Sequence, residues 1–194
     1  MVQKRNLTKD KIISVALELA NDIGVKEVTF PKLAEKLEIK YPSLYNHYAN
    51  ADELRDDMAT RLFRMLNEEV GPLLIGKTRG AAVKLYANAY RGLSMKYRGS
   101  YELLTSIPKK SNEALFEESS KHTAILRQIL ESFELDRATL VHRSRFLRSS
   151  IHGFISLNML GFLQTERGVS TEESFQIMIA DIIALCEQRK PASD

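Results

Sequence analysis

Apolar residues recur at helical spacing along almost the whole chain, and this feature limits the possible fold more than any other. One run places Ile12, Ala16, Leu19 and Ile23 on one face, and the stretch from Leu54 to Leu66 repeats the pattern. Residues three and four apart share a face only in a helix, and no alternating strand pattern of comparable length occurs. The sequence therefore predicts an all-α protein with about nine helices.

Capping residues and prolines indicate where these helices begin and end. Thr8 is a candidate N-cap, and Gly24 lies where a helix end favours a residue with positive φ. Pro31 and Pro42 each lie in the first turn of a short helix, where a missing N–H costs little. The predicted helices span about residues 9–23, 30–37, 41–48, 52–70, 78–97, 100–106, 112–132, 137–163 and 171–187.

Composition narrows the setting but leaves the function open. The 194 residues carry a net charge of +3 and one cysteine, Cys186, which is typical of a reducing compartment. No apolar run is long enough to span a membrane, and the N-terminal residues resemble no secretion signal. We expect a cytoplasmic protein without a membrane segment, and the charge permits an acidic partner such as nucleic acid.

The stretch YPSLYNHY, residues 41–48, concentrates aromatic and polar side chains behind a proline. Together with residues 30–37 it forms two short helices, joined by EIKY, that are expected to pack on the first helix as a helix-turn-helix. Leu44 and Tyr48 share the inward face. The outward face has no carboxylate and suits phosphates and base edges, although aromatic residues at helical spacing are often core residues. Its members are Lys40, Tyr41, Ser43, Tyr45, Asn46 and His47.

Residues 8–54 closely resemble the N-terminal DNA-binding domain of TetR-family transcriptional regulators. The resemblance rests on Ala16 in the first helix and Gly24 at its end, on the VTFPKLAEKL segment, and on the LYNHYANADEL segment. It implies a DNA-binding domain at residues 1–51 and an effector-binding and dimerisation domain at residues 52–194. It also implies a homodimer that binds double-stranded DNA at a near-palindromic operator, most often as a repressor released by a small organic effector.

The resemblance also implies roles for individual residues. Phosphate contacts would come from Thr29, Tyr45 and Tyr48, and Lys4 and Arg5 could form an arm in the neighbouring groove. Base contacts would come from Lys40, Tyr41, Pro42, Ser43 and Asn46, with His47 on the same outward face.

Three residues depart from the usual family pattern. Glu38 replaces the glycine that is common in the turn, so this residue must adopt an uncommon backbone conformation or the turn must shift. Ala49 and Ala51 stand where relatives often have basic residues that contact phosphates. We therefore expect a weaker grip on DNA than is usual, with a moderate salt dependence.

The last two predicted helices are expected to form the dimer interface. Their apolar stripes are wider than one core contact needs, and Gly153 suggests a close helix approach. The segment RSSIHGFISLNMLGF also resembles a subgroup of TetR regulators with a His-Gly pair. Packing inside a single chain is the alternative. The predicted interface residues are Ile151, Phe154, Ile155, Met159, Phe175, Met178, Ile179 and Ile182.

Candidate effector contacts combine aromatic rings with a few polar groups, which suits an organic ligand. Each of them could instead be an ordinary core or surface residue. The candidates are Tyr86, Tyr90, Phe116, His122, Arg143 and His152.

Other classes of protein have less support in the sequence. There is no phosphate-binding loop, no paired cysteines and no metal-binding histidine spacing, so we expect no enzyme activity, no cofactor and no metal. An alternative is an all-helical dimeric ligand- or protein-binding scaffold with weakened DNA binding. The sequence does not identify the operator, the effector, the regulated genes or the direction of regulation.

Overall fold

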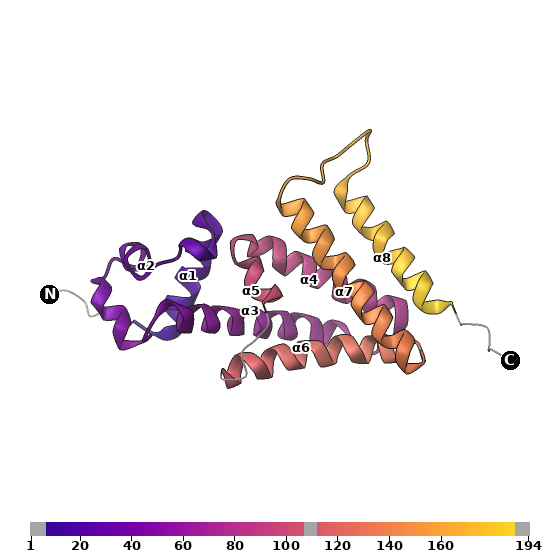
Figure 1. The fold of residues 1–194 in the computed structure, drawn as a ribbon, viewed down its shortest axis with the longest axis horizontal. Helices are drawn as coiled ribbons and strands as arrows, with labels where there is room; N and C mark the ends of the chain where they lie inside the picture. Colours follow the sequence, from indigo (N-terminus) through magenta and orange to yellow (C-terminus); the bar gives the residue numbers. More distant parts are fainter. Residues whose placement is uncertain (1–6, 107–111, 189–194) are drawn as a thin grey trace. The chain divides into compact units, whose positions relative to one another are not determined.

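The computed structural model describes residues 7–106 and 112–188, so the predicted DNA-binding arm of Lys4 and Arg5 lies outside the described residues. Every regular element in this part is a helix (Figure 1). The elements are α1 (Lys9–Ile23), η1 (Val25–Glu27), α2 (Phe30–Leu37), η2 (Tyr41–Asn46), α3 (Ala51–Leu73), α4 (Arg79–Lys96), η3 (Arg98–Ser100), α5 (Tyr101–Thr105), α6 (Glu113–Glu131), α7 (Arg137–Met159) and α8 (Thr171–Glu187), where η denotes a 3-10 helix.

The all-α prediction is confirmed, and a helix is present at each of the nine predicted positions. The local signals explain the agreement at the first helix. The Thr8 hydroxyl accepts a hydrogen bond from the Lys11 backbone at 3.2 Å, and Gly24 ends α1 with φ 83°. These contacts involve neighbours in sequence, so a sequence pattern can reveal them.

Two elements differ from the prediction. The third helix, η2, is a 3-10 helix, in which Ser43 N–H donates to the Lys40 carbonyl and His47 N–H to the Leu44 carbonyl, both at 2.9 Å. Helix α7 ends at Met159 rather than near residue 163, because Gly161 turns the chain with φ 78°.

The chain divides into two compact units. The first contains Met1–Met65 and Lys96–Ser119, and the second contains Leu66–Met95 and Ser120–Asp194. Helices α3 and α6 each contribute residues to both units. The expected division at residues 51 and 52 follows the sequence motifs and does not coincide with these units, so it stays a prediction.

The first unit is built around α1. Ile12, Ala16 and Ala20 of this helix are fully buried, as are Leu33 of α2 and Leu44 of η2. This core holds α2 against α1 and η2 against α2, and η3 also packs on α1. The apolar face that was expected to organise the three-helix head is therefore the interior of this unit.

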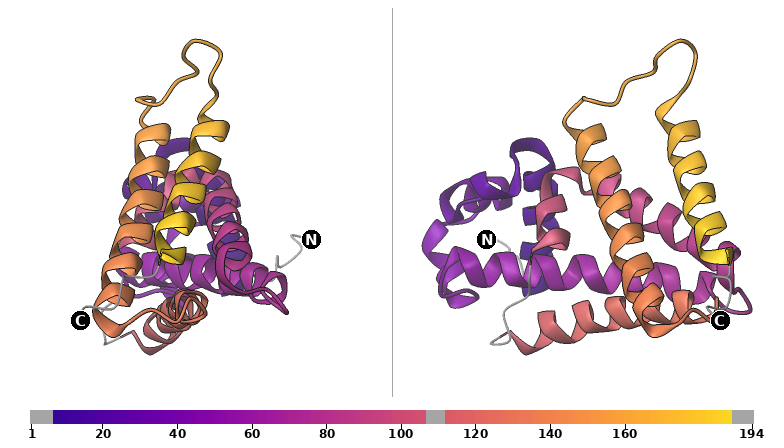
Figure 2. Two further views of the ribbon diagram at one scale, coloured as in Figure 1. Left: turned by 90° about the vertical axis from the view of Figure 1, so that its right-hand side faces the viewer. Right: turned by 45° about the vertical axis from the view of Figure 1, so that its right-hand side comes forward.

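In the second unit α7 and α8 lie side by side (Figure 2). Polar contacts join α8 to α4: Arg91 pairs with Glu172, and Gln176 donates to the Asn88 side chain at 2.7 Å. The Phe154 and Phe175 rings meet edge to face, with centroids 5.2 Å apart. No helix in the described part of the chain has the length and apolar character to cross a membrane.

Candidate nucleic-acid interface and ligand cluster

The turn between α2 and η2 is made by Glu38 in the left-handed region, with φ 54° and ψ 46°. Its N–H donates to the Glu35 carbonyl and the N–H of Ile39 to the Ala34 carbonyl, each at 3.0 Å, which closes the end of α2. The sequence predicted that this glutamate must adopt an uncommon conformation or shift the turn. The first of these outcomes is confirmed.

The outward face of η2 presents aromatic and polar groups to solvent. Tyr41 and Tyr45 have exposed fractions of 51% and 56%. The Tyr45 ring meets Phe30 edge to face, with centroids 5.1 Å apart, so its position on the surface is fixed. No carboxylate occurs from residue 39 to residue 51. Lys40, Pro42 and Asn46 are also exposed, and Ser43 and His47 are partly exposed.

The two outlying phosphate candidates differ in exposure. Thr29 is exposed at the start of α2, and its hydroxyl makes no capping hydrogen bond. Tyr48 is only 1% exposed, and its hydroxyl oxygen is shielded from solvent. Burial, followed by the charge of Asp57, raises the pKa of this phenol. The expected phosphate contact of Tyr48 is therefore wrong for this conformation, because the side chain belongs to the core.

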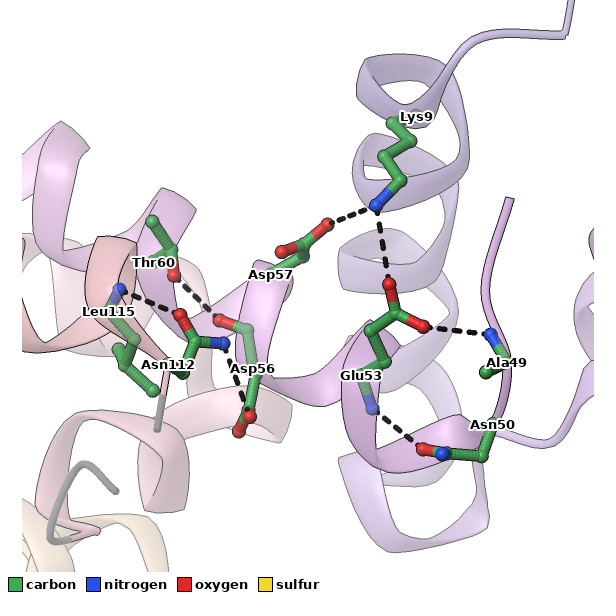
Figure 3. Close-up of polar contacts among 9 residues, drawn as sticks. All are labelled: Lys9, Ala49, Asn50, Glu53, Asp56, Asp57, Thr60, Asn112 and Leu115. Atoms are coloured by element: carbon green, nitrogen blue, oxygen red, sulfur yellow. Dashed lines mark hydrogen bonds and ion pairs between the residues drawn. The ribbon is translucent and has the colours of Figure 1, made fainter. Parts of the chain in front are cut away.

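A polar network holds the segment between η2 and α3 (Figure 3). Asn50 caps α3 by accepting from Glu53 N–H at 3.0 Å, and the Glu53 carboxylate accepts from Ala49 N–H at 2.7 Å. Lys9 of α1 reaches Glu53 and Asp57, both at 3.5 Å. Asn50 and Glu53 belong to the motif that carries the family resemblance, but no positioning role was predicted for them, although their spacing is a capping-box signal.

The network is also relevant to the prediction that Ala49 weakens the binding of DNA phosphates. The N–H of Ala49 is already bonded to a carboxylate of its own chain, and Asp52 adds another negative charge in the first turn of α3. A helix N-terminus that is already occupied by carboxylates attracts phosphate less.

Asn112 makes a second set of contacts in the same unit (Figure 3). Its side chain donates to Asp56 at 3.2 Å and accepts from Leu115 N–H at 3.0 Å, so it caps α6 and ties that helix to α3.

Four of the six predicted effector residues lie together in the second unit. Tyr86 and Tyr90 come from α4, His122 from α6 and His152 from α7. The Tyr86 hydroxyl is 2.8 Å from His122 Nε2, and the ring centroids of Tyr90 and His152 are 5.2 Å apart. The two tyrosines and His122 are buried, and His152 is partly exposed. This Tyr–His cluster is thus made of contacting rings from three helices.

The charge near the cluster is positive. Burial, followed by the charges of Arg148 and His152, lowers the pKa of His122 to about 4. Burial and then Arg148 also lower the pKa of His152. Both imidazoles are therefore neutral near pH 7. Arg148 was not among the predicted contacts, and no sequence signal marks it apart from its i, i+4 spacing to His152.

The other two candidates do not belong to the cluster. Phe116 is 44% exposed on the first turn of α6 and makes none of these ring contacts. Arg143 lines a cavity elsewhere in the second unit, next to Cys186. An effector role for any of the six stays a prediction.

Most of the predicted dimer residues are core residues of the single chain. Ile151, Ile155, Phe175, Ile179 and Ile182 have exposed fractions of 0–2%. A side chain that is already buried adds almost no contact area with a partner, so these five assignments are corrected. The reason is that helical spacing marks a buried stripe without showing what covers it. Phe154, Met159 and Met178 are partly exposed.

The structure shows other apolar residues of these helices at the surface. Phe146, Leu157 and Leu160 of α7 and its C-terminal end are 43%, 44% and 68% exposed, and Ile177 of α8 is 60% exposed. An added Cβ at Gly153 would meet no atom within 4 Å, so the expected close approach at Gly153 does not occur inside the described part of the chain.

The chain is all-helical, with an exposed helix-turn-helix followed by further helices. These features are typical of DNA-binding regulators. Residues 12–58 match the family model described as bacterial regulatory proteins, tetR family. Residues 83–182, more than half of the chain, match the model described as tetracyclin repressor-like, C-terminal domain. The chain belongs to the TetR family, whose members are transcriptional regulators rather than enzymes.

Relatives match along nearly the whole chain. An uncharacterized HTH-type transcriptional regulator of Mycobacterium tuberculosis, Rv0681, is 27% identical over 94% of this chain and 83% of its own length. YobS of Bacillus subtilis, also an uncharacterized HTH-type regulator, is 26% identical over 91% of this chain and 92% of its own.

Solved structures show the same fold. A variant of TetR from Acinetobacter baumannii AYE, in complex with minocycline, aligns with TM-score 0.70 and 23% identity, over 94% of this chain and 97% of that one. A Rhodococcus protein of unknown function aligns with TM-score 0.78 and 14% identity, over 97% of this chain and all of the other.

Proposed function

We propose that this TetR-family regulator is a cytoplasmic homodimeric repressor that a small organic effector releases from a near-palindromic operator. The observation that carries the DNA-binding part is the exposed, carboxylate-free face of η2, held on a three-helix head. Its tyrosines, amide and lysine match the groups that contact phosphates and base edges in a major groove. A two-fold dimer would present this face twice, about 34 Å apart, to two half-sites.

Selection of bound duplexes from random DNA tests the operator. We expect a palindrome whose fluorescence-anisotropy affinity falls with salt. Asn46→Ala should weaken binding about tenfold, since a lost bidentate base contact corresponds to ~1–3 kcal/mol. Gln128→Ala, an exposed change on α6, is the control. Absence of any preferred sequence, with weak binding even at low salt, would favour the scaffold alternative.

The dimer surface that we propose is the exposed stripe on α7 and α8. Phe146, Gly153, Leu157 and Leu160 repeat every three to seven residues, so they share one side of the chain with Ser149 between them. Small residues flanked by large apolar ones allow two helices to approach closely, and the open space at Gly153 supports this arrangement. Two copies of the α7–α8 pair would then form a four-helix interface.

Sedimentation analysis tests this surface. Leu157→Glu would place a charge on the stripe and should convert a dimer to monomers, with weaker operator binding as a consequence. Ala124→Glu puts the same charge on an exposed position of α6 and should leave the dimer intact. A wild-type chain that is monomeric at all concentrations would refute the dimer.

The effector part of the proposal rests on the Tyr–His cluster. The cluster joins α4, α6 and α7, so a ligand that separates its rings would shift these helices. Such a ligand would favour a conformation of α3 in which the head binds the operator more weakly, by a coupling free energy of ~1–3 kcal/mol.

A compound screen on the protein–operator complex tests this coupling. Tyr86→Phe removes the hydrogen bond to His122 at 2.8 Å but retains the ring, so it should change the response to an effector more than operator affinity itself. Compounds that bind the protein without changing its operator affinity would count against the mechanism.

A further inference from the structure

A cavity lies in the second unit, where the turn between α6 and α7 meets the C-terminal end of α8. Its volume is about 590 Å³, within the range of small-molecule sites. Two of its lining side chains, Phe133 and Cys186, are buried, and Leu135 between the helices is partly buried. These three side chains give the cavity an apolar wall.

Arg143 lines the same cavity and has an unsatisfied donor. Its Nε has no exposed surface and no hydrogen-bond acceptor, and its guanidinium makes no ion pair with any residue in ranges 7–106 and 112–188. The charge still acts inside the cavity, because it partly offsets the effect of burial on the pKa of the Cys186 thiol. A shielded donor without an acceptor destabilises the protein. An anion in the cavity would satisfy it once the Arg143 side chain turns toward the cavity, because Nε is closed to solvent in this conformation.

The remaining charges indicate what kind of anion fits. Arg79 is already engaged, since its Nε donates to the Ser132 carbonyl at 3.1 Å and it lies 3.8 Å from Glu134. Glu134, Asp136 and Glu187 contribute three carboxylates to the lining. The Arg143 guanidinium can pair with one negative charge of a ligand. The three carboxylates would repel a second negative charge, so a monoanion fits this cavity better than a phosphate dianion.

We propose that this cavity binds a small monocarboxylic acid with an apolar body, whose carboxylate pairs with Arg143 and whose body lies against Phe133 and Leu135. Guanidinium and carboxylate can form two parallel hydrogen bonds, which gives the pair both strength and orientation.

The site is separate from the Tyr–His cluster. Arg143 and His152 are nine residues apart on α7, which places them about 180° apart around the helix. Binding of an acid at Arg143 therefore does not depend on the proposed effector role of the cluster or on operator binding.

Isothermal titration calorimetry on the full chain tests the site with benzoate and octanoate. We expect at least one of them to bind, and the neutral amides of the same acids and inorganic phosphate to bind about tenfold more weakly or not at all. Arg143→Gln should lower the affinity for the acid by about tenfold or more, and Arg143→Lys should lower it less, because it keeps the charge but loses the paired geometry.

The matched control is Arg145→Gln. Arg145 is exposed and two residues further along α7, so it points about 200° away from Arg143. Its loss should leave acid binding unchanged, and circular dichroism of each variant checks that the fold is retained. The proposal is overturned if neither acid binds with a Kd below about 1 mM, if the amides or phosphate bind equally well, or if Arg143→Gln binds like the wild type.

Discussion

The side chain of Asn21 forms hydrogen bonds with two backbone groups of the turn after α4, those of Lys96 and Gly99. Its Nδ2 donates to the Lys96 carbonyl at 2.9 Å, and its Oδ1 accepts from Gly99 N–H at 3.2 Å. A Cβ at Gly99 would lie 1.8 Å from the Ala20 carbonyl oxygen. The end of α4 is therefore fixed to the C-terminal end of α1 at a separation that only glycine permits.

Gly99→Ala should destabilise the protein by ~1–3 kcal/mol or more. The atom that the new methyl group would strike is backbone, which cannot rotate away, so η3 must move off α1. Urea unfolding measures the change. Gly92→Ala is the control: it lies inside α4 with no atom near its Cβ position, and it should stabilise the chain by ~0.5–1 kcal/mol. Equal stability of both variants would contradict the close approach.

Glu38→Gly should stabilise the head by ~0.5–1 kcal/mol, because glycine adopts the left-handed conformation without the Cβ clash. It also removes a negative charge from the turn before η2, so operator affinity should rise at low salt. Glu35→Gly makes the same substitution inside α2 and should destabilise by ~1 kcal/mol. Thermal unfolding and anisotropy of both variants would show whether the sign differs as expected.

The sequence predicted the helices and their ends better than it predicted which side chains contact each other in the fold. Thr8 and Gly24 act on backbone groups within four residues, so their pattern alone located the ends of α1. The pairing of Tyr86 with His122 joins residues 36 apart. Helical spacing assigns each residue to one face of its own helix, but it does not show which other helix packs against that face.

The same limit explains the dimer residues. Ile155 and Leu157 are both apolar and lie two positions apart, yet one is 1% exposed and the other 44%. Only the packing of α7 on its neighbours separates the core stripe from the exposed one. The exposed face of η2 was easier to predict, because the apolar Leu44 indicated which side of that short helix is buried.

Stability should fall as the pH drops from about 6.5 to about 4. His122 has a pKa of about 4 in the folded chain against 6.5 ordinarily, so the unfolded chain takes up its proton first. The contribution is therefore present above pH 6.5 and is lost toward pH 4, amounting to ~3 kcal/mol. The lowered pKa of His152 acts in the same direction.

Urea unfolding between about pH 7 and about pH 4.5 measures this dependence. His122→Gln should flatten the curve, whereas His142→Gln, at an exposed position of α7, should leave it as in the wild type. A wild-type curve that does not decline below about pH 6 would show that the imidazole titrates freely in the folded chain.

The capped starts of α3 and α8 separate stability from DNA binding. Asn50 and Glu53 close the start of α3, directly after η2, and Ser170 and Glu173 close the start of α8. Asn50→Ala and Ser170→Ala should each destabilise by ~1 kcal/mol, because each loses one capped N–H. Only Asn50→Ala should also weaken operator binding in anisotropy, since the segment after η2 would no longer be held in place. An equal loss of operator affinity in both variants would mean that DNA binding follows overall stability rather than the local anchoring of η2.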